Sequence, residues 1–177
     1  MAAQGQSRNN RSRGNERREP KAFDERVLEL ARVRRVTKGG KRMRFRATVL
    51  IGDHRGRVGY GIAKGIDVQG SVGKASRAAR KRLITVPLVR ETIPHEIRHK
   101  FGAAIILLKP APAGTGVKAG GAMRVVLELA GVPNVVGKQL GAKNKINNVK
   151  AVMAALSSLR REPTSAPKPV EAEVVAA

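Results

Sequence analysis

Hydrophobic and polar residues alternate with a period of two between residues 42 and 51. The apolar positions are Met43, Phe45, Ala47, Val49 and Ile51. The positions between them are Arg42, Arg44, Arg46, Thr48 and Leu50. Because successive side chains of a β-strand point to opposite faces, the pattern predicts a strand with one buried face and one largely arginine face.

Two more strands are predicted beside this one. Residues 32–37 read as a strand, with residues 24–30 as a short lead-in, and Lys38-Gly39-Gly40-Lys41 reads as a turn. Gly39 and Gly40 supply the positive φ angles that tight hairpin turns need. A second turn over 52–56 leads to a third strand over 57–63. Three antiparallel strands in a meander are expected.

A helix is predicted after these strands. Its apolar stripe at helical spacing is Val68, Val72, Ala75, Ala79 and Leu83. Lys74, Arg77 and Lys81 lie opposite the stripe. Small residues on the stripe allow a helix to pack closely on a sheet. The strands and the helix together predict a first domain over residues 23–86.

The second half of the chain predicts another mixed unit, over residues 87–161. Alternation over 93–101 and an apolar run over 103–108 favour strands, and 109–121 is a loop rich in Pro and Gly. A helix is predicted next, and Gly131 and Pro133 end it. Residues 135–140 are ambiguous. A last helix is predicted to begin near Asn147. The predicted class is therefore α+β. Composition predicts a disordered basic arm over 1–22 and a disordered tail over 162–177.

Charge narrows the choice of partner. The chain of 177 residues has 36 Lys and Arg against 13 Asp and Glu, a formal net charge of +23. Between Leu30 and Arg161 there are 28 basic residues and five acidic ones, so the excess lies on the predicted folded body. Nucleic acid is the expected partner, because binding each phosphate releases condensed counterions.

Other classes are disfavoured by what the sequence lacks. No apolar run reaches the roughly 18 residues of a membrane span, and residues 1–22 contain no apolar block typical of a secretory signal. Cys is absent, which excludes disulfides and cysteine zinc sites. No membrane partner is expected, and a cytoplasmic location is the default.

Aromatic residues are scarce, at three Phe, one Tyr and no Trp. Proteins that read single strands stack bases on aromatic rings, so this chain is expected to recognise folded RNA by backbone and shape through Arg and Lys. The residues predicted to contact RNA are Arg32, Arg34, Arg35, Lys38, Gly39, Gly40, Lys41, Arg42, Arg44, Arg46, Arg55, Arg57, Lys64, Lys74, Arg77 and Lys81.

One motif suggests catalysis. His95-Glu96-Ile97-Arg98-His99 matches the HExxH pattern of zinc peptidases, in which a helix brings both histidines to one metal. The period of two through this segment favours a strand, where the two histidines would lie about 13 Å apart. The glycine-rich stretch from Gly114 to Gly121 also lacks the GxGxxG spacing of dinucleotide sites. No enzyme, metal, cofactor or small-molecule substrate is expected.

Three segments carry a resemblance to a known family. They are RVTKGGKRMRF, GDHRGRVGYGIAKG and PAPAGTGVKAGGAMRVVLELAGVPNVVGKQLGAKNKIN. In order and spacing, over residues 23–160, they resemble the bacterial family of the fifth small-subunit ribosomal protein. The family often reads Asn-Pro-Ile-Asn where this chain has Asn144-Lys145-Ile146-Asn147, so the entry to the last helix is expected to differ.

The resemblance implies an N-terminal domain like double-stranded-RNA-binding domains and a C-terminal domain with a left-handed βαβ unit. It implies 16S ribosomal RNA as ligand, the fourth and eighth small-subunit proteins as neighbours, and a place in the small ribosomal subunit. It further implies roles in head-to-body geometry and, with the fourth and twelfth proteins, in translational accuracy.

The resemblance also assigns roles to particular residues. The turn over 37–41 would reach the neck helix near the spectinomycin site. The residues assigned to the accuracy interface are Gly114, Gly116, Gly120, Gly121 and Arg124, with Gly116 and Arg124 against the fourth protein.

Two other functions compete with this interpretation. One is a protein that coats double-stranded RNA or DNA outside the ribosome. The other is a zinc hydrolase built on His95 and His99.

Overall fold

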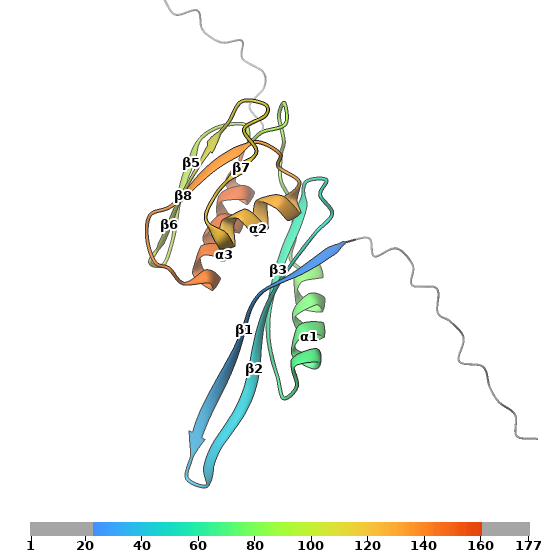
Figure 1. The fold of residues 1–177 in the computed structure, drawn as a ribbon, viewed down its shortest axis with the longest axis vertical. Coiled ribbons are helices and arrows are strands. Elements are labelled where there is room, and N and C mark those ends of the chain that lie inside the picture. Colours follow the sequence, from blue (N-terminus) through green and yellow to red (C-terminus); the bar gives the residue numbers. More distant parts are fainter. Residues whose placement is uncertain (1–22, 161–177) are drawn as a thin grey trace, which may run out of the picture.

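The computed structural model describes residues 23–160, and in this range it shows two four-stranded sheets and three α-helices (Figure 1). The predicted arm over 1–22 and the predicted tail over 162–177 lie outside the described residues. The α+β class predicted from the sequence is confirmed.

The N-terminal unit is an antiparallel sheet in the order β1-β2-β3-β4. Its strands are β1 (Asp24–Thr37), β2 (Gly40–Gly52), β3 (Arg57–Gly65) and β4 (Leu83–Thr85). The predicted meander is present, but the lead-in over 24–30 belongs to β1, and β4 adds a fourth strand. Leu83 was predicted on the helix and instead pairs with Gly59, because the helix ends before it.

Helix α1 (Val68–Arg80) packs on β2 and β3. It begins at Asp67, whose carboxylate accepts hydrogen bonds from the backbone N–H of Gln69 at 3.2 Å and of Gly70 at 3.4 Å. The close packing depends on Gly61 of β3, because a Cβ there would run into the backbone of Ala75 and Ala79. The small apolar stripe predicted from the sequence is therefore the face that packs on the sheet.

The C-terminal unit is a mixed sheet in the order β5-β6-β8-β7. Its elements are β5 (Ile97–Phe101), β6 (Ala104–Pro110), β7 (Val117–Lys118), α2 (Gly121–Ala130), β8 (Val135–Gln139) and α3 (Lys145–Ser158). The parallel pairing of β7 with β8 across α2 makes a βαβ unit.

Several segments of this unit differ from the sequence prediction, and the loop predicted over 109–121 contains strand β7. The strand predicted over 93–101 begins only at Ile97, although Ile93 is buried in the core. The ambiguous segment over 135–140 contains strand β8. Helix α3 begins at Lys145, because the side chain of Asn144 accepts a hydrogen bond from the N–H of Ile146 at 3.0 Å and so caps the helix there.

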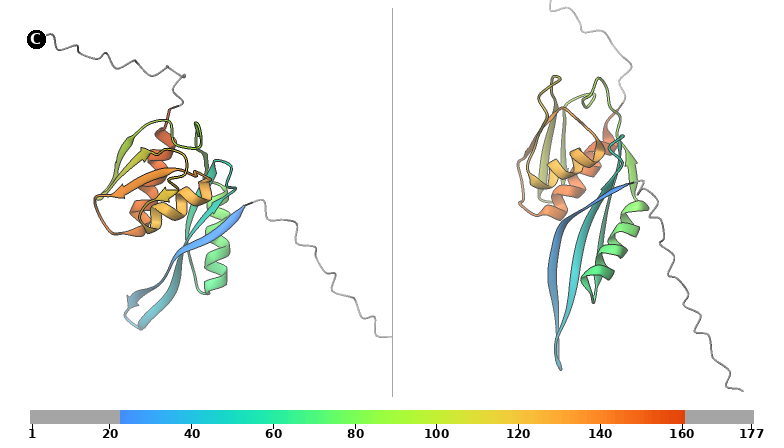
Figure 2. Two further views of the ribbon diagram at one scale, coloured as in Figure 1. Left: turned by 45° about the horizontal axis from the view of Figure 1, so that its top comes forward. Right: turned by 45° about the vertical axis from the view of Figure 1, so that its right-hand side comes forward.

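Helices α2 and α3 lie between the two sheets, and α1 covers the opposite face of the N-terminal sheet (Figures 1 and 2). The larger apolar core joins Leu50 and Val58 of the N-terminal sheet to Leu127, Leu129 and Leu156 of the helices. Residues 47–51 of β2 are therefore buried on both faces, whereas one exposed face was predicted. The C-terminal unit covers the second face.

The other end of β2 is more exposed than predicted. Met43 was predicted on the buried face, but it is 52% exposed, and Val36 across the hairpin is 72% exposed. The β1–β2 hairpin extends past the end of α1 and away from the C-terminal unit, so neither covers its tip (Figures 1 and 2). Within residues 23–160, neither α1 nor the C-terminal unit packs against the apolar side chains at this end.

Candidate nucleic-acid interface

A two-stranded ribbon of basic residues projects from the body of the protein. We call residues 32–44 the hairpin ribbon. Its strands pair antiparallel from Arg32 opposite Phe45 to Thr37 opposite Gly40. An isolated pair of strands depends on its own ladder of hydrogen bonds and on cross-strand contacts. The ribbon is therefore an exposed arm that the rest of the fold holds at its base.

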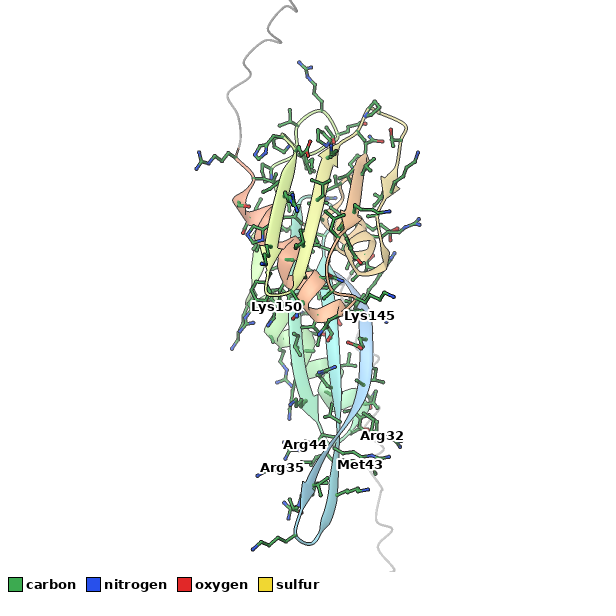
Figure 3. The ribbon with its side chains drawn as sticks, turned by 90° about the vertical axis from the view of Figure 1, so that its left-hand side faces the viewer. Arg32, Arg35, Met43, Arg44, Lys145 and Lys150 are labelled. Carbon is green, nitrogen blue, oxygen red and sulfur yellow. The ribbon has the colours of Figure 1, made fainter. Side chains whose placement is uncertain are left out.

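Basic side chains of the ribbon and of β3 gather around one groove. Arg34, Arg35, Arg42, Arg44 and Lys64 line one shallow groove, together with Val33. The register explains the grouping, since Arg35 lies opposite Arg42 and Lys64 of β3 lies opposite Arg46. Figure 3 shows Arg32, Arg35 and Arg44 spread over this part of the molecule.

This clustering has an electrostatic consequence. Like charges opposite each other on neighbouring strands are destabilising. Within residues 23–160 the ion pairs include no arginine or lysine of the ribbon and not Lys64. A polyanion would relieve this repulsion, and the groove is a place where it can bind.

The turn at the tip is tighter than predicted. Thr37 pairs with Gly40, so Lys38 and Gly39 form the loop, and the Thr37 hydroxyl donates a hydrogen bond to the Gly40 carbonyl at 3.1 Å. Gly40 has a φ of 133°, whereas Gly39 is not among the residues with positive φ. Only one of the two glycines supplies the backbone geometry for which both were predicted. A Cβ at either position would meet no atom within 4 Å, so the tip faces open space.

Six predicted RNA-contacting residues lie outside the ribbon and groove, and three of them lie in β2, in the β2–β3 turn and at the start of β3. Arg46 Nη2 lies 3.9 Å from Glu29 Oε2, and its side chain is 32% exposed. Arg57 Nε donates to Asp53 Oδ2 at 2.6 Å, and its guanidinium lies over the Phe23 ring. Arg55 lies in the same β2–β3 turn. This turn is at the opposite end of β2 from the ribbon tip.

Asp53 organises that turn. Burial alone would raise the pKa of its carboxyl, but a hydrogen bond from the Arg57 side chain and backbone hydrogen bonds from Arg55 and Arg57 hold the pKa below its ordinary value. Arg57 is thus committed to a partner within the protein.

The predicted residues of α1 make a second, separate basic surface. Lys74, Arg77 and Lys81 lie along its exposed face with Arg80, which also forms an ion pair with Glu25 of β1 at 3.1 Å. Because α1 covers one face of the sheet and the C-terminal unit the other, the predicted residues form two surfaces rather than one.

The residues assigned to the accuracy interface fall in two places. Gly114 and Gly116 lie in the loop before β7 with φ of 85° and 73°, and Gly120 and Gly121 begin α2. The buried side chain of Asn134 accepts a hydrogen bond from the N–H of Gly116 at 3.1 Å. The backbone N–H of Asn134 donates to the carbonyl of Glu91 at 3.3 Å. Asn134 therefore joins the glycine loop to the segment that follows the N-terminal unit.

Arg124 has a partner, Glu128, that was not predicted from the sequence. Its Nε donates to Glu128 Oε1 at 2.8 Å, and Arg26 of β1 donates to Glu128 Oε2 at 2.7 Å. The hydrogen bond from Arg124 lowers the pKa of Glu128 below its ordinary value. Burial opposes this shift, and the hydrogen bond from Arg26 adds to it. The spacing of four residues between Arg124 and Glu128 was a detectable signal, but Arg26 comes from the other unit.

The β2–β3 turn also caps helix α2. The N–H groups of His54 and Gly56 donate to the carbonyls of Leu129 at 3.1 Å and Ala130 at 2.8 Å. His54 Nδ1 lies 2.8 Å from the carbonyl oxygen of Glu128. The last carbonyls of a helix have no partner within it, and here the N-terminal unit provides partners. No local pattern in the sequence indicates this contact.

The HExxH segment is not helical, as its period of two predicted. His99 lies in β5, and His95 lies before it, with Nε2 accepting a hydrogen bond from the N–H of Arg160 at 3.3 Å. Across residues 23–160 there is no group of three or more His, Cys, Asp or Glu side chains placed to hold a metal ion. In the same range, no helix has the length and apolar character required to cross a membrane.

Comparisons with known proteins match both units. The family model described as ribosomal protein S5, N-terminal domain, matches residues 23–87, and the model described as ribosomal protein S5, C-terminal domain, matches residues 99–166. The small ribosomal subunit protein uS5 of Acaryochloris marina is 47% identical over 161 residues, which cover 90% of this chain and 89% of the relative.

Two further relatives support the same match. The uS5 protein of Synechococcus elongatus is 52% identical over 139 residues, which cover 78% of this chain and 77% of its own. The uS5c protein of Spinacia oleracea is 49% identical over 140 residues, which cover 78% of this chain and 46% of its own.

Proposed function

The chain belongs to the ribosomal protein S5 family, and on that premise we propose that its hairpin ribbon binds 16S ribosomal RNA by backbone and shape contacts. As a member of this family it is a structural, non-enzymatic protein of the small ribosomal subunit. That subunit lies in the cytoplasm, or in the chloroplast for the plastid relative.

The observation that carries the proposal is the groove of Arg34, Arg35, Arg42, Arg44 and Lys64. These cations are held on paired strands, and none has a carboxylate partner within residues 23–160. Arginine suits phosphate recognition because its planar guanidinium donates two parallel hydrogen bonds. A ribbon of this kind contacts the phosphates of a folded RNA and reads the shape of the backbone rather than its sequence.

The basic face of α1 provides a second set of contacts in this proposal. Lys74, Arg77 and Lys81 follow one another at helical spacing and point away from the sheet. With RNA on both surfaces, the protein would tie together two RNA segments. This supports the proposed role in stabilising the arrangement of head and body in the small subunit.

The tip of the ribbon is assigned a distinct task. The turn around Lys38 and Gly39 stands clear of the described fold, and within residues 23–160 a Cβ on Gly39 or Gly40 would meet no atom within 4 Å. We propose that it contacts the neck helix near the spectinomycin site, as the family resemblance implies.

The accuracy role is proposed for the C-terminal unit. The loop around Gly116 and the start of α2 would contact the fourth small-subunit protein. This contact would contribute to translational accuracy together with the twelfth small-subunit protein. The hydrogen bond from Gly116 to Asn134 supports this proposal, because it fixes the loop in one conformation. The eighth protein is proposed as a further neighbour.

The proposal is tested by measuring how the full chain binds 16S ribosomal RNA at increasing salt. Phosphate contacts make the logarithm of the binding constant fall linearly with the logarithm of salt concentration. An affinity that does not change with salt would contradict the proposal. Sedimentation of a cell lysate in moderate salt separates the ribosomal role from general coating of nucleic acid: the protein should travel with small subunits, and a mainly free pool would favour the coating protein.

A further inference from the structure

A groove lies where the two units meet beside α3. Tyr60, Leu83 and Ile84 line it from the N-terminal unit, and Phe101, Lys150 and Met153 line it from the C-terminal unit. Arg82 is also part of the lining, and within residues 23–160 the lining contains no carboxylate. The lining thus combines apolar side chains with two cations, Arg82 and Lys150.

Each aromatic ring in the groove has a cation beside it. The guanidinium carbon of Arg82 lies 6.0 Å from the centre of the Tyr60 ring, and Lys150 Nζ lies 5.4 Å from the centre of the Phe101 ring. Phe101 is 40% exposed. No aromatic platform was predicted, because the aromatic residues are few and far apart in the sequence. The fold brings two of them into one groove.

We propose that this groove binds one unpaired nucleotide of an RNA, with the base stacked on Phe101 and the neighbouring phosphates bound by Lys150 and Arg82. Unpaired bases stack on aromatic rings and on the planes of arginine side chains. Lys150 has a long flexible side chain, so its ammonium group can leave the ring for a phosphate while the base takes its place. The inference rests on the proposed binding of RNA and names a further element of that RNA.

The position of the groove supports RNA over other occupants. Figure 3 labels Lys150 of the groove on the body of the molecule, and Arg32, Arg35 and Arg44 on the hairpin ribbon below it. A single RNA could therefore extend from the ribbon along the body to this groove. Within residues 23–160 the two cations of the groove have no carboxylate partner, and the phosphates of a nucleotide would complement their charge.

The test compares two RNA duplexes of one sequence, one fully paired and one with a single bulged fluorescent adenine analogue. Binding of the full chain is measured by titration, and stacking by quenching of the analogue. We expect the bulged duplex to bind about fivefold more tightly, with quenching, since stacking of one base is worth about that factor at its lower limit.

Two variants make the result specific. Phe101→Leu keeps an apolar side chain but removes the ring. It should abolish both the tighter binding of the bulged duplex and the quenching of the analogue. Leu88→Ala is the matched control, because Leu88 is an apolar residue of similar exposure, at 38%, outside the groove. It should leave both unchanged. Circular dichroism confirms that each variant is folded.

The outcomes separate this inference from the proposed function. If both duplexes bind equally in a salt-dependent manner, the nucleotide site is wrong while RNA binding by the ribbon stands, and the groove is left to a protein partner. If neither duplex nor 16S ribosomal RNA binds, the proposed function itself fails. Equal gains for the wild type and Phe101→Leu would also overturn the inference.

Discussion

Arg26 on β1 and Glu128 on α2 are 102 positions apart in the sequence, and their side chains form an ion pair at 2.7 Å. Glu128 holds Arg124 at the same time, at 2.8 Å. One carboxylate thus links the N-terminal sheet to the residue that the family resemblance assigns to the accuracy interface. A change in the contact between the units would reach Arg124 through this carboxylate.

Glu128→Gln should lower the free energy of unfolding by about 1 kcal/mol, because two arginines lose a charged partner that is partly buried. Chemical denaturation of the full chain measures the change. Glu96→Gln is the matched control, since Glu96 pairs with Lys109 at 3.3 Å and both side chains are 52% exposed. It should have almost no effect. A loss of equal size in the two variants would contradict a special role for Glu128.

The stability of the protein should fall in acid partly through Glu128 and Asp53. The folded protein holds both pKa values below their ordinary values of 4.5 and 3.8. The unfolded chain therefore binds protons first as the pH falls, and the stabilisation present above about pH 4.5 is lost as the pH drops through the lowered values. Unfolding measured from pH 6 to pH 3 should show a shallower decline in Glu128→Gln. An unchanged pH profile in that variant would mean that other carboxylates cause the decline.

Arg44→Ala should weaken RNA binding and reduce the slope of its salt dependence by about one, because one phosphate contact is lost. Arg46→Ala, two positions along the same strand, should reduce the slope less. Arg46 already lies near Glu29, at 3.9 Å, whereas Arg44 lines the groove of the hairpin ribbon. The comparison is made by titration of 16S ribosomal RNA at several salt concentrations. Equal effects of the two substitutions would show that RNA contacts are not concentrated on the residues that line the groove.

Gly131→Ala should destabilise the protein by about 1–3 kcal/mol. Gly131 has a φ of 74°, and a Cβ there would run into the backbone of His54 in the turn that caps α2. Gly73→Ala is the matched control on the exposed face of α1, where a Cβ meets no atom within 4 Å. That substitution should stabilise the helix by about 0.5–1 kcal/mol. Thermal or chemical unfolding measures the change in stability of each variant. Destabilisation by Gly73→Ala would show that α1 is more crowded than the structure indicates.

Local sequence patterns correctly predicted those features that depend on interactions between neighbouring residues. Gly131 was predicted to end α2, and it does so with a left-handed backbone. The period of two correctly placed the HExxH histidines outside a helix. The start of α3 was harder, because the capping hydrogen bond of Asn144 spans only a few atoms and the sequence offered several polar residues in that place. Boundaries depend on single contacts that a pattern does not contain.

The sequence by itself determined that this protein has an α+β fold with a basic hairpin, because alternation, helical spacing and charge are properties of neighbouring residues. Tertiary structure alone decided which parts of that hairpin are covered. The same strand β2 is buried on both faces at Leu50 and exposed at Met43, since α1 and the C-terminal unit reach only the first. It also decided that Arg26 meets Glu128 and that Tyr60 and Phe101 line one groove. Contacts between distant segments depend on how the two units pack, and no local pattern records that.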